Sequence, residues 1–266
     1  MIRLLAVYAA EAKIGVQDQF QYRIAVFFNI LGFLIEPIVY LVVWRTVAEQ
    51  AGPIGGYDAD DFTAYYIVWT LVRNMNLALT PYVWEWWIRH GRVSDALLKP
   101  VNLYHRQLAV FGGFKVVWIL VWIPIAAVLI LIFRPTISPT PFEILTFFVA
   151  IWLGYIIRFS VLWLMGLVSF WTTRASALFE IIVAAELLLS GRLVPLSVMP
   201  AWVQTLSNFF PFKWTFQFPI EILIGKLTPQ EIVVGIGVQF VWIAILGVAI
   251  LLVWRRAVRR YTAVGS

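Results

Sequence analysis

Long apolar stretches separated by short polar segments make up most of this 266-residue chain. A bilayer core of about 30 Å needs roughly 20 residues of helix, and that length predicts six membrane crossings. The predicted crossings are residues 24–47, 61–80, 114–133, 142–170, 174–190 and 229–254. Ahead of them, residues 1–22 repeat apolar side chains at helical spacing, which predicts a helix lying in the membrane interface. The expected fold class is an all-α integral membrane protein, with a single transmembrane domain over residues 1–266.

Three of the predicted crossings have recognisable start signals. Thr140 and Thr228 each precede a proline and are followed three residues later by a glutamate. The hydroxyl and the carboxylate satisfy free amides at the helix entrance, and proline lacks a donor that would be unpaired there. Asp58, Asp60 and Asp61 can do the same for the second crossing. Because this acidic cluster lacks the ligand spacing of a calcium loop, we interpret it as a helix cap.

The fifth predicted crossing is short and ends in broken backbone. Residues 175–190 are 16 residues, which reach only about 24 Å at helical rise. Gly191 and Pro195 then end the helix before it has crossed comfortably. The following segment, residues 191–227, predicts short helices that dip into the outer leaflet and return, which requires cover from protein or a water-lined cavity. The alternative is an ordinary amphipathic loop on the outer surface.

Composition excludes several classes of protein. Hydrophobic residues are 62% of the chain and charged residues 13%, which is not the balance of a soluble domain. There is no cysteine, so disulfides, thiolate catalysis and cysteine-bound metals are excluded. The chain has no GxxxxGK phosphate loop, and its two histidines both fall in the segment after the second crossing. We therefore expect no enzyme activity and no cofactor or metal site in this chain.

The net charge of +6 is interpreted as a signal of membrane orientation. The basic residues lie beside apolar spans, which does not favour a nucleic-acid partner. With six crossings, most of them, including Lys115, fall on one side, and Arg192 is among the few on the other. Because lysine and arginine are enriched in cytoplasmic loops, both termini are expected in the cytoplasm, and the protein in a bacterial-type plasma membrane.

The largest predicted cytoplasmic piece is residues 81–112, which mixes aromatic and basic side chains. Ser94–Leu98 should form a short helix that stops near Pro100. One interpretation is a surface helix held by anionic lipid. The other is a docking element for a cytoplasmic partner, which the length of the segment favours.

Five ionisable residues lie inside the predicted spans, where such residues are functional candidates. Counted from the helix entrances, Glu36, Arg73 and Glu186 lie near the membrane midplane, and Arg158 and Glu180 lie nearer the cytoplasmic boundary. We predict a contact between Arg158 and Glu180, and a pair between Arg73 and either Glu36 or Glu186. One acid is left over, either protonated or facing a cavity. The alternative is that all five form buried pairs without a role in transport.

Two longer motifs resemble a known family. IRHGRVSDALLKPVN follows the second crossing and LLLSGRLVPLSVMPAWVQTLSNFFPF spans the end of the fifth. Together they are similar to the permease subunits of ABC-2 type transporters, in a branch once catalogued as a domain of unknown function, and the resemblance covers essentially the whole chain. It implies two six-helix permeases, identical or homologous, driven by two separate ATP-binding cassette subunits that carry the ATP and magnesium.

The resemblance also implies site residues. A region that couples to the ATPase would contain Arg89, Gly91, Arg92, Asp95, Leu98 and Pro100. Re-entrant helices that cap the exit on the outer side would contain Gly191, Pro195, Pro200, Pro211 and Phe212. The transport path of the family lies at the subunit interface, near the first, second and fifth helices, on which Glu36, Arg73 and Glu186 fall.

The functional hypothesis is one permease half of an ATP-driven exporter. An amphipathic, lipid-like or drug-like cargo suits the aromatic-rich interior, and the passage would be a cleft between two permeases. The alternative is an ATP-independent channel or a proton-coupled carrier that uses the buried glutamates and arginines. A third class is a membrane scaffold or sensor that moves no solute.

Overall fold

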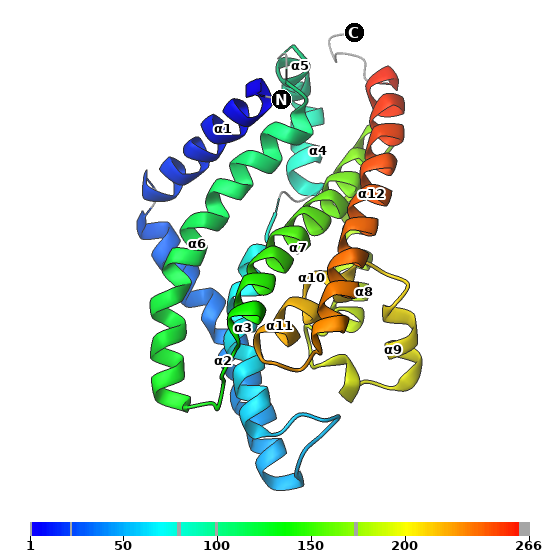
Figure 1. Cartoon of the computed structure of the whole chain (residues 1–266). Helices are drawn as coiled ribbons and strands as arrows, with labels where there is room; N and C mark the ends of the chain where they lie inside the picture. The colour runs from blue at the N-terminus through cyan, green and yellow to red at the C-terminus, as the bar shows by residue number, and fades with distance from the viewer. Residues whose placement is uncertain (1, 22, 79–80, 99–100, 173–174, 261–266) are drawn as a thin grey trace.

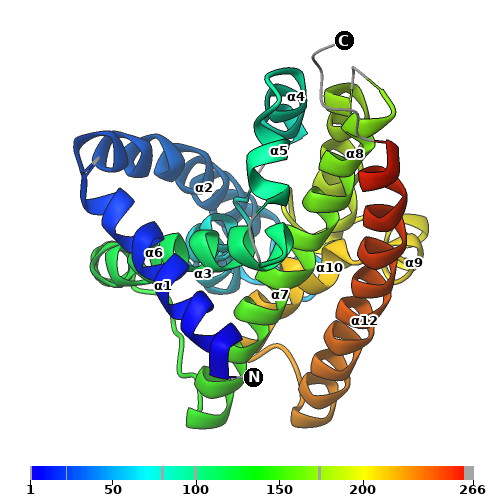
Figure 2. The same cartoon turned by 90° about the horizontal axis from the view of Figure 1, so that it is seen from above.

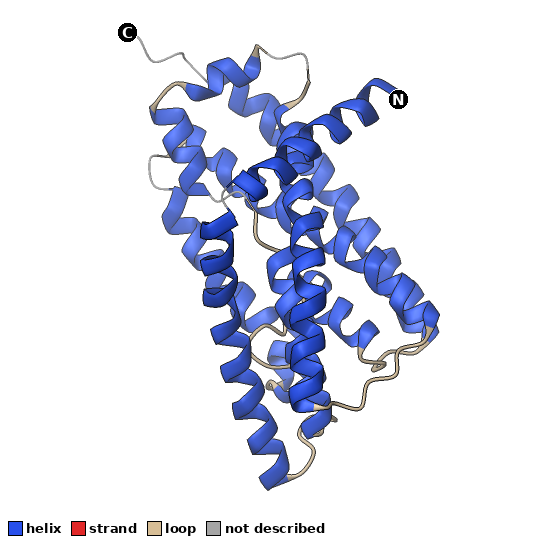
Figure 3. Ribbon diagram, turned by 90° about the vertical axis from the view of Figure 1, so that its left-hand side faces the viewer, coloured by secondary structure: helices blue, strands red, loops and turns tan. Residues whose placement is uncertain are grey.

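The computed structural model describes residues 2–21, 23–78, 81–98, 101–172 and 175–260. Over these residues the chain is helical and contains no strand (Figure 3). The expected all-α fold class is therefore confirmed for the part of the chain that the structure describes.

Among the described residues, three helices are long and apolar enough to cross a membrane. These are α6 (Leu103–Phe133), α7 (Pro141–Leu167, continued by the 3-10 turn η1, Val168–Phe170) and α12 (Pro229–Arg260). They cover the third, fourth and sixth predicted crossings. In the most apolar stretch of α7, 56% of the residues are buried within the protein, against 11% in α6 and 17% in α12. The fourth crossing is therefore the central helix, and the other two keep wide apolar faces for the surroundings (Figure 2).

The other predicted crossings coincide with α2 (Arg23–Ala51), α3 (Ala59–Met75) and α8 (Ala175–Leu189). α2 and α3 pack side by side as a helical hairpin. α3 has 17 residues and α8 has 15, so they measure about 26 Å and about 22 Å. Both are shorter than the three long helices, as the sequence predicts for the fifth crossing.

The expected helix caps are present. The Thr140 hydroxyl and the Glu143 carboxylate each accept from the other residue's backbone amide, which forms a capping box at the start of α7. Asp58 and Asp61 form the same arrangement at the start of α3. Thr228 is bonded to Glu231 in the same way before α12. These local signals fix where the helices begin.

Two boundaries differ from the prediction near one buried lysine. α3 ends at Met75, before the expected residue 80, and α6 begins at Leu103, before the expected residue 114. Lys115 was expected on the cytoplasmic side, but it is buried, with 2% of its surface exposed. Its ammonium group donates to the carbonyl oxygens of Asn74, at 2.7 Å, and Leu77. A buried cation from α6 thus satisfies carbonyls at the end of α3, which hydropathy alone does not reveal.

Helix α1 (Ile2–Gln21), which the sequence predicts to lie in the membrane interface, packs along α6. A side chain at Gly113 would meet the backbone oxygen of Ala12 at 2.1 Å, and one at Gly15 would meet that of Val110 at 2.2 Å. The two backbones therefore touch, as small residues permit between membrane helices. The ion pair between Arg106 and Glu11, at 2.6 Å, adds a polar contact.

Two further groups of short helices lie at different levels of the molecule. α4 (Pro81–Arg89) and α5 (Arg92–Leu97) lie at the end that holds the start of α1 and the end of α12 (Figure 1). Residues 191–227, here called the outer segment, contain the 3-10 turn η2 and three short helices. These are η2 (Leu196–Val198), α9 (Ala201–Ser207), α10 (Phe212–Thr215) and α11 (Gln217–Leu223). α10 and α11 pack against α7, within its length rather than beyond its end.

Candidate functional site

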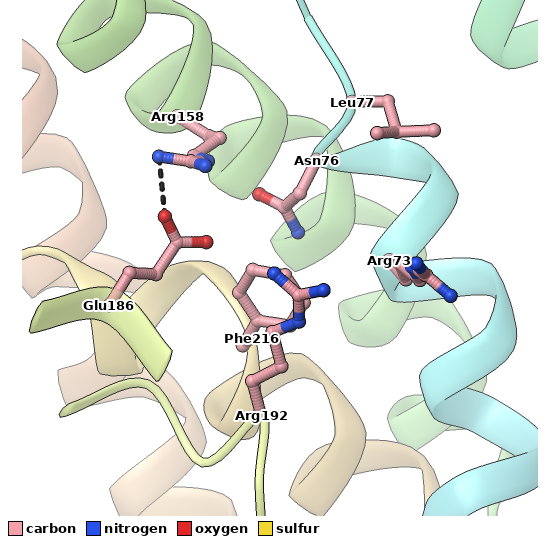
Figure 4. A pocket seen from close by; sticks show the side chains of 7 residues that line it. All are labelled: Arg73, Asn76, Leu77, Arg158, Glu186, Arg192 and Phe216. Carbon is pink, nitrogen blue, oxygen red and sulfur yellow. Dashed lines mark ion pairs between the residues drawn. The ribbon is translucent and has the colours of Figure 1, made fainter. Parts of the chain in front are cut away.

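A small cavity of about 80 Å³ lies where α3, α7, α8 and the outer segment meet. Figure 4 shows the residues that line it: Arg73, Asn76, Leu77, Arg158, Glu186, Arg192 and Phe216. Three arginines and a glutamate converge here from separate parts of the chain. The cavity gathers three of the ionisable residues singled out from the sequence.

Arg158 pairs with Glu186 rather than with Glu180. The Arg158 Nη1 to Glu186 Oε2 distance is 2.6 Å, and the two side chains are 9% and 1% exposed. The predicted contact between Arg158 and Glu180 is wrong because depth was counted along upright helices. α7 is inclined and about 40 Å long, so its residue count overstates the depth of Arg158. Glu180 instead accepts a hydrogen bond from the Tyr82 hydroxyl of α4.

Glu36 joins two arginines at the edge of the same site. It lies 2.7 Å from Nη2 of Arg73, which is one of the two pairs expected for Arg73, and 3.4 Å from Nη2 of Arg192. Both guanidinium groups also lie over the ring of Trp69, at 5.4 Å and 6.0 Å from its centre. The aromatic face adds a cation–π contact to each arginine and holds the two cations near one carboxylate.

Arg192 is the residue of this site that sequence reasoning missed. It was placed on the outer side, but α8 ends at Leu189, and Gly191 turns the chain with a φ of +80°. Arg192 therefore enters the cavity from the turn. A sequence signal could have indicated this position. If a predicted helix is too short to cross the membrane, the residues directly after its break are expected at membrane depth.

The turn after α8 is held in place by tyrosines of α3. The hydroxyl of Tyr65 donates to the Gly191 carbonyl at 2.7 Å, and that of Tyr66 donates to the Leu193 carbonyl at 2.9 Å. Gln217 adds two bonds, because its side-chain oxygen accepts from the Leu196 backbone amide at 2.8 Å and its own backbone amide donates to the Ser190 carbonyl at 3.1 Å. Protein groups thus satisfy polar backbone groups of the turn.

The prolines of the outer segment lie at the starts of its short helices. Pro195 precedes η2, Pro200 precedes α9 and Pro211 precedes α10, while Phe212 is buried with 4% exposure.

The outer segment is also bonded to the loop before α3, because the Tyr57 hydroxyl donates to Glu221 of α11 at 2.7 Å. Burial and, next, the Glu221 carboxylate raise the pKa of Tyr57 well above its usual value, so the hydroxyl stays a donor.

We expect Gly191→Ala to destabilise the protein more than an alanine substitution at a glycine that has the same positive φ but open space around it. The new Cβ would lie 2.5 Å from Gln217 Oε1 and 2.8 Å from the Tyr65 hydroxyl. Positive φ costs an alanine about 1–2 kcal/mol and overpacking about 1–3 kcal/mol more. Gly52→Ala is the matched control, because Gly52 has a φ of +81° with open space around it. Unfolding in detergent would measure both, and equal losses would contradict the tight packing of the turn.

The predicted coupling residues lie around α4 and α5. Gly91, with a φ of +66°, joins the two helices; Arg89 is near Glu85 at 3.8 Å, and Arg92 lies over the ring of Trp86 at 6.0 Å. Leu98 is 85% exposed. Pro100 and the side chain of Asp95 lie outside the described residues.

α4 is fixed to the membrane helices by aromatic contacts. Trp84 is fully buried, and a side chain at Gly166 of α7 would meet its ring at 2.0 Å. Its ring centre lies 5.3 Å from that of Trp163, also on α7. Because Tyr82 contacts Glu180 of α8, α4 touches both the fourth and the fifth crossings.

Apolar helices of membrane-spanning length define a multi-pass membrane protein, and one of them, α7, contributes Arg158 to the charged cavity. The chain belongs to the ABC-2 family of transporter proteins, whose family model matches residues 34–265. It is therefore a membrane component of an ABC transporter rather than a catalytic subunit, and its family implies ABC ATPase partners. Comparison with curated proteins and with solved structures gave no match.

Proposed function

We propose that this chain is the permease subunit of an ATP-driven exporter, in which a separate pair of ATPases binds and hydrolyses ATP with magnesium. Two permeases, identical or homologous, would enclose a cleft for an amphipathic, lipid-like or drug-like cargo. The chain would cross a plasma membrane of bacterial type six times, with both termini in the cytoplasm. The observation that carries the proposal is the exposed α4–α5 corner, which lies beside the basic end of α12 and away from the outer segment.

The α4–α5 corner offers a route for motion from an ATPase into the membrane. An ATPase that covers Leu98 and Arg92 would move α4, which is attached to α7 through Trp84 and to α8 through Tyr82. α8 carries Glu186 into the charged cavity and leads directly into the turn at Gly191. A displacement of α8 would therefore act on the cavity and on the outer segment together. In this proposal the outer segment is a set of re-entrant helices that caps the exit.

Leu98→Glu and Arg92→Glu are expected to reduce co-purification of the ATPase by about tenfold or more, because an apolar anchor and a rim charge are lost. Both side chains are exposed, so the permease itself should insert and fold normally. Arg134→Glu is the matched charge reversal at the opposite end and should leave the association unchanged. Undiminished co-purification of the first two variants would contradict the coupling assignment.

A transport assay in reconstituted vesicles distinguishes this function from a channel, a secondary carrier or a scaffold. The proposal expects solute movement only when the ATPase and ATP are present. Movement by the permease alone, driven by a proton or ion gradient, would replace it with a channel or a secondary carrier. The absence of solute movement from a complete, ATP-hydrolysing complex would favour a scaffold.

A further inference from the structure

We propose that the charged cavity binds the phosphate headgroup of an amphipathic substrate. This inference rests on the proposed function, because it names the cargo class for the same site. Three guanidinium groups line or border the cavity, against two carboxylates, those of Glu36 and Glu186. The group therefore carries one excess positive charge, in a partly buried place where an anion can pair with it.

The cavity also holds hydrogen-bond donors that the protein does not use. Arg158 is 92% buried, since 8% of its surface is exposed. Its Nε, like the buried Nε of Arg192, has no hydrogen-bond partner among the described residues. Buried polar groups are normally paired, and the planar fork of arginine matches phosphate oxygens in particular. Because both arginines line the cavity, an anion there would accept from the parts of their guanidinium groups that face it.

Unpaired acceptors in the same cavity favour a phosphate monoester over a simple carboxylate. Asn76 Oδ1 has no partner within the described part of the chain, whereas its amide nitrogen donates to Val72 and Thr215, which fixes the orientation of the side chain. Oε1 of Glu186 is also without a hydrogen bond there. A phosphate monoester that keeps one proton offers oxygens to the arginines and an O–H to Asn76 or Glu186.

Size and lining indicate a headgroup and not a whole cargo. About 80 Å³ is much smaller than the roughly 300–1,000 Å³ of a pocket that encloses a drug-sized molecule. Leu77 and Phe216 form an apolar part of the wall, and Leu77 is 39% exposed. A hydrocarbon chain can therefore continue outward over these residues while the phosphate stays with the arginines.

The experiment measures binding to the permease alone, purified in a neutral detergent, with octyl phosphate, octyltrimethylammonium and inorganic phosphate as probes. Octyl phosphate should raise the melting temperature in a saturable way, and the cationic amphiphile should not. Arg192→Gln should weaken octyl phosphate about ten- to a hundredfold, the loss of one or two charge-assisted hydrogen bonds. Arg192→Lys should retain part of the affinity, and Arg134→Gln should retain all of it, because Arg134 caps the C-terminal end of α6 and does not line the cavity.

Equal binding of the two amphiphiles, or unchanged binding in Arg192→Gln, would overturn the inference. If inorganic phosphate binds as tightly as octyl phosphate, the claim that the ligand is an amphiphile is overturned and the site is assigned to free phosphate. If Arg192→Gln does not fold, the wild-type selectivity between the two amphiphiles still decides. Because no ATPase is present, the outcome is independent of the proposed function: an ATP-driven permease that ignores octyl phosphate would refute only this inference.

Discussion

Glu186→Leu is expected to lower the free energy of unfolding by about 3–5 kcal/mol, the largest loss among the cavity substitutions. It would leave the guanidinium of Arg158 buried without its carboxylate, which lies 2.6 Å away in the native protein. Arg158→Met should cost a similar amount for the converse reason. The double variant should recover most of the stability, because an apolar pair replaces a buried ion pair with little net cost.

A double-mutant cycle in detergent, followed by unfolding, measures this coupling. Glu180→Gln is the matched control, because the Glu180 side chain is exposed and accepts a hydrogen bond from Tyr82 of α4. It should cost less than about 1 kcal/mol. Additive losses from Glu186→Leu and Arg158→Met, or a cost for Glu180→Gln as large as theirs, would contradict the assigned pairing.

Trp84→Ala is expected to cost about 3–5 kcal/mol and to weaken the link between ATPase and membrane helices. The ring is fully buried between α4 and α7, and its loss opens a cavity beside Gly166. Trp84→Phe should keep most of the packing, since the ring position remains filled. Trp86→Ala, which changes a half-exposed tryptophan of the same helix, is the control.

Two measurements check the Trp84 prediction. Unfolding of the permease gives the stability change, and ATP hydrolysis by the assembled complex, with and without cargo, gives the coupling. Trp84→Ala should reduce cargo-stimulated hydrolysis more than Trp86→Ala does. A Trp84→Ala complex with normal stability and normal stimulation would show that α4 does not transmit motion through this contact.

Hydropathy predicted much of the helical layout because lipid-facing helices must be apolar along their whole length. The caps at Thr140 and Thr228 were equally predictable, since they depend only on neighbours three residues away. The end of α3 was not predictable in this way, because Lys115, which satisfies its carbonyls, comes from a different helix. An isolated lysine beside an apolar run has the same sequence signature whether it faces the cytoplasm or a buried helix end.

The charge pairs also differ in how far the sequence predicts them. Glu36 and Arg73 lie on α2 and α3, which form a hairpin, so counting residues from their shared loop places them at one level. Arg158 lies on an inclined helix and pairs with a residue of the short α8. The two helices do not start from a shared loop, so residue counts along them cannot be compared as depths. Arg192 depends on the direction of a single turn at Gly191, a tertiary property held by the tyrosines of α3.

The direct backbone contact between α1 and α6 couples the position of the N-terminal helix to that of α6. At Gly15 and Gly113 no side chain separates the two backbones, so neither helix can roll against the other without collision. Any tilting of α6 must therefore move α1 with it. A probe attached to α1 would register that tilting.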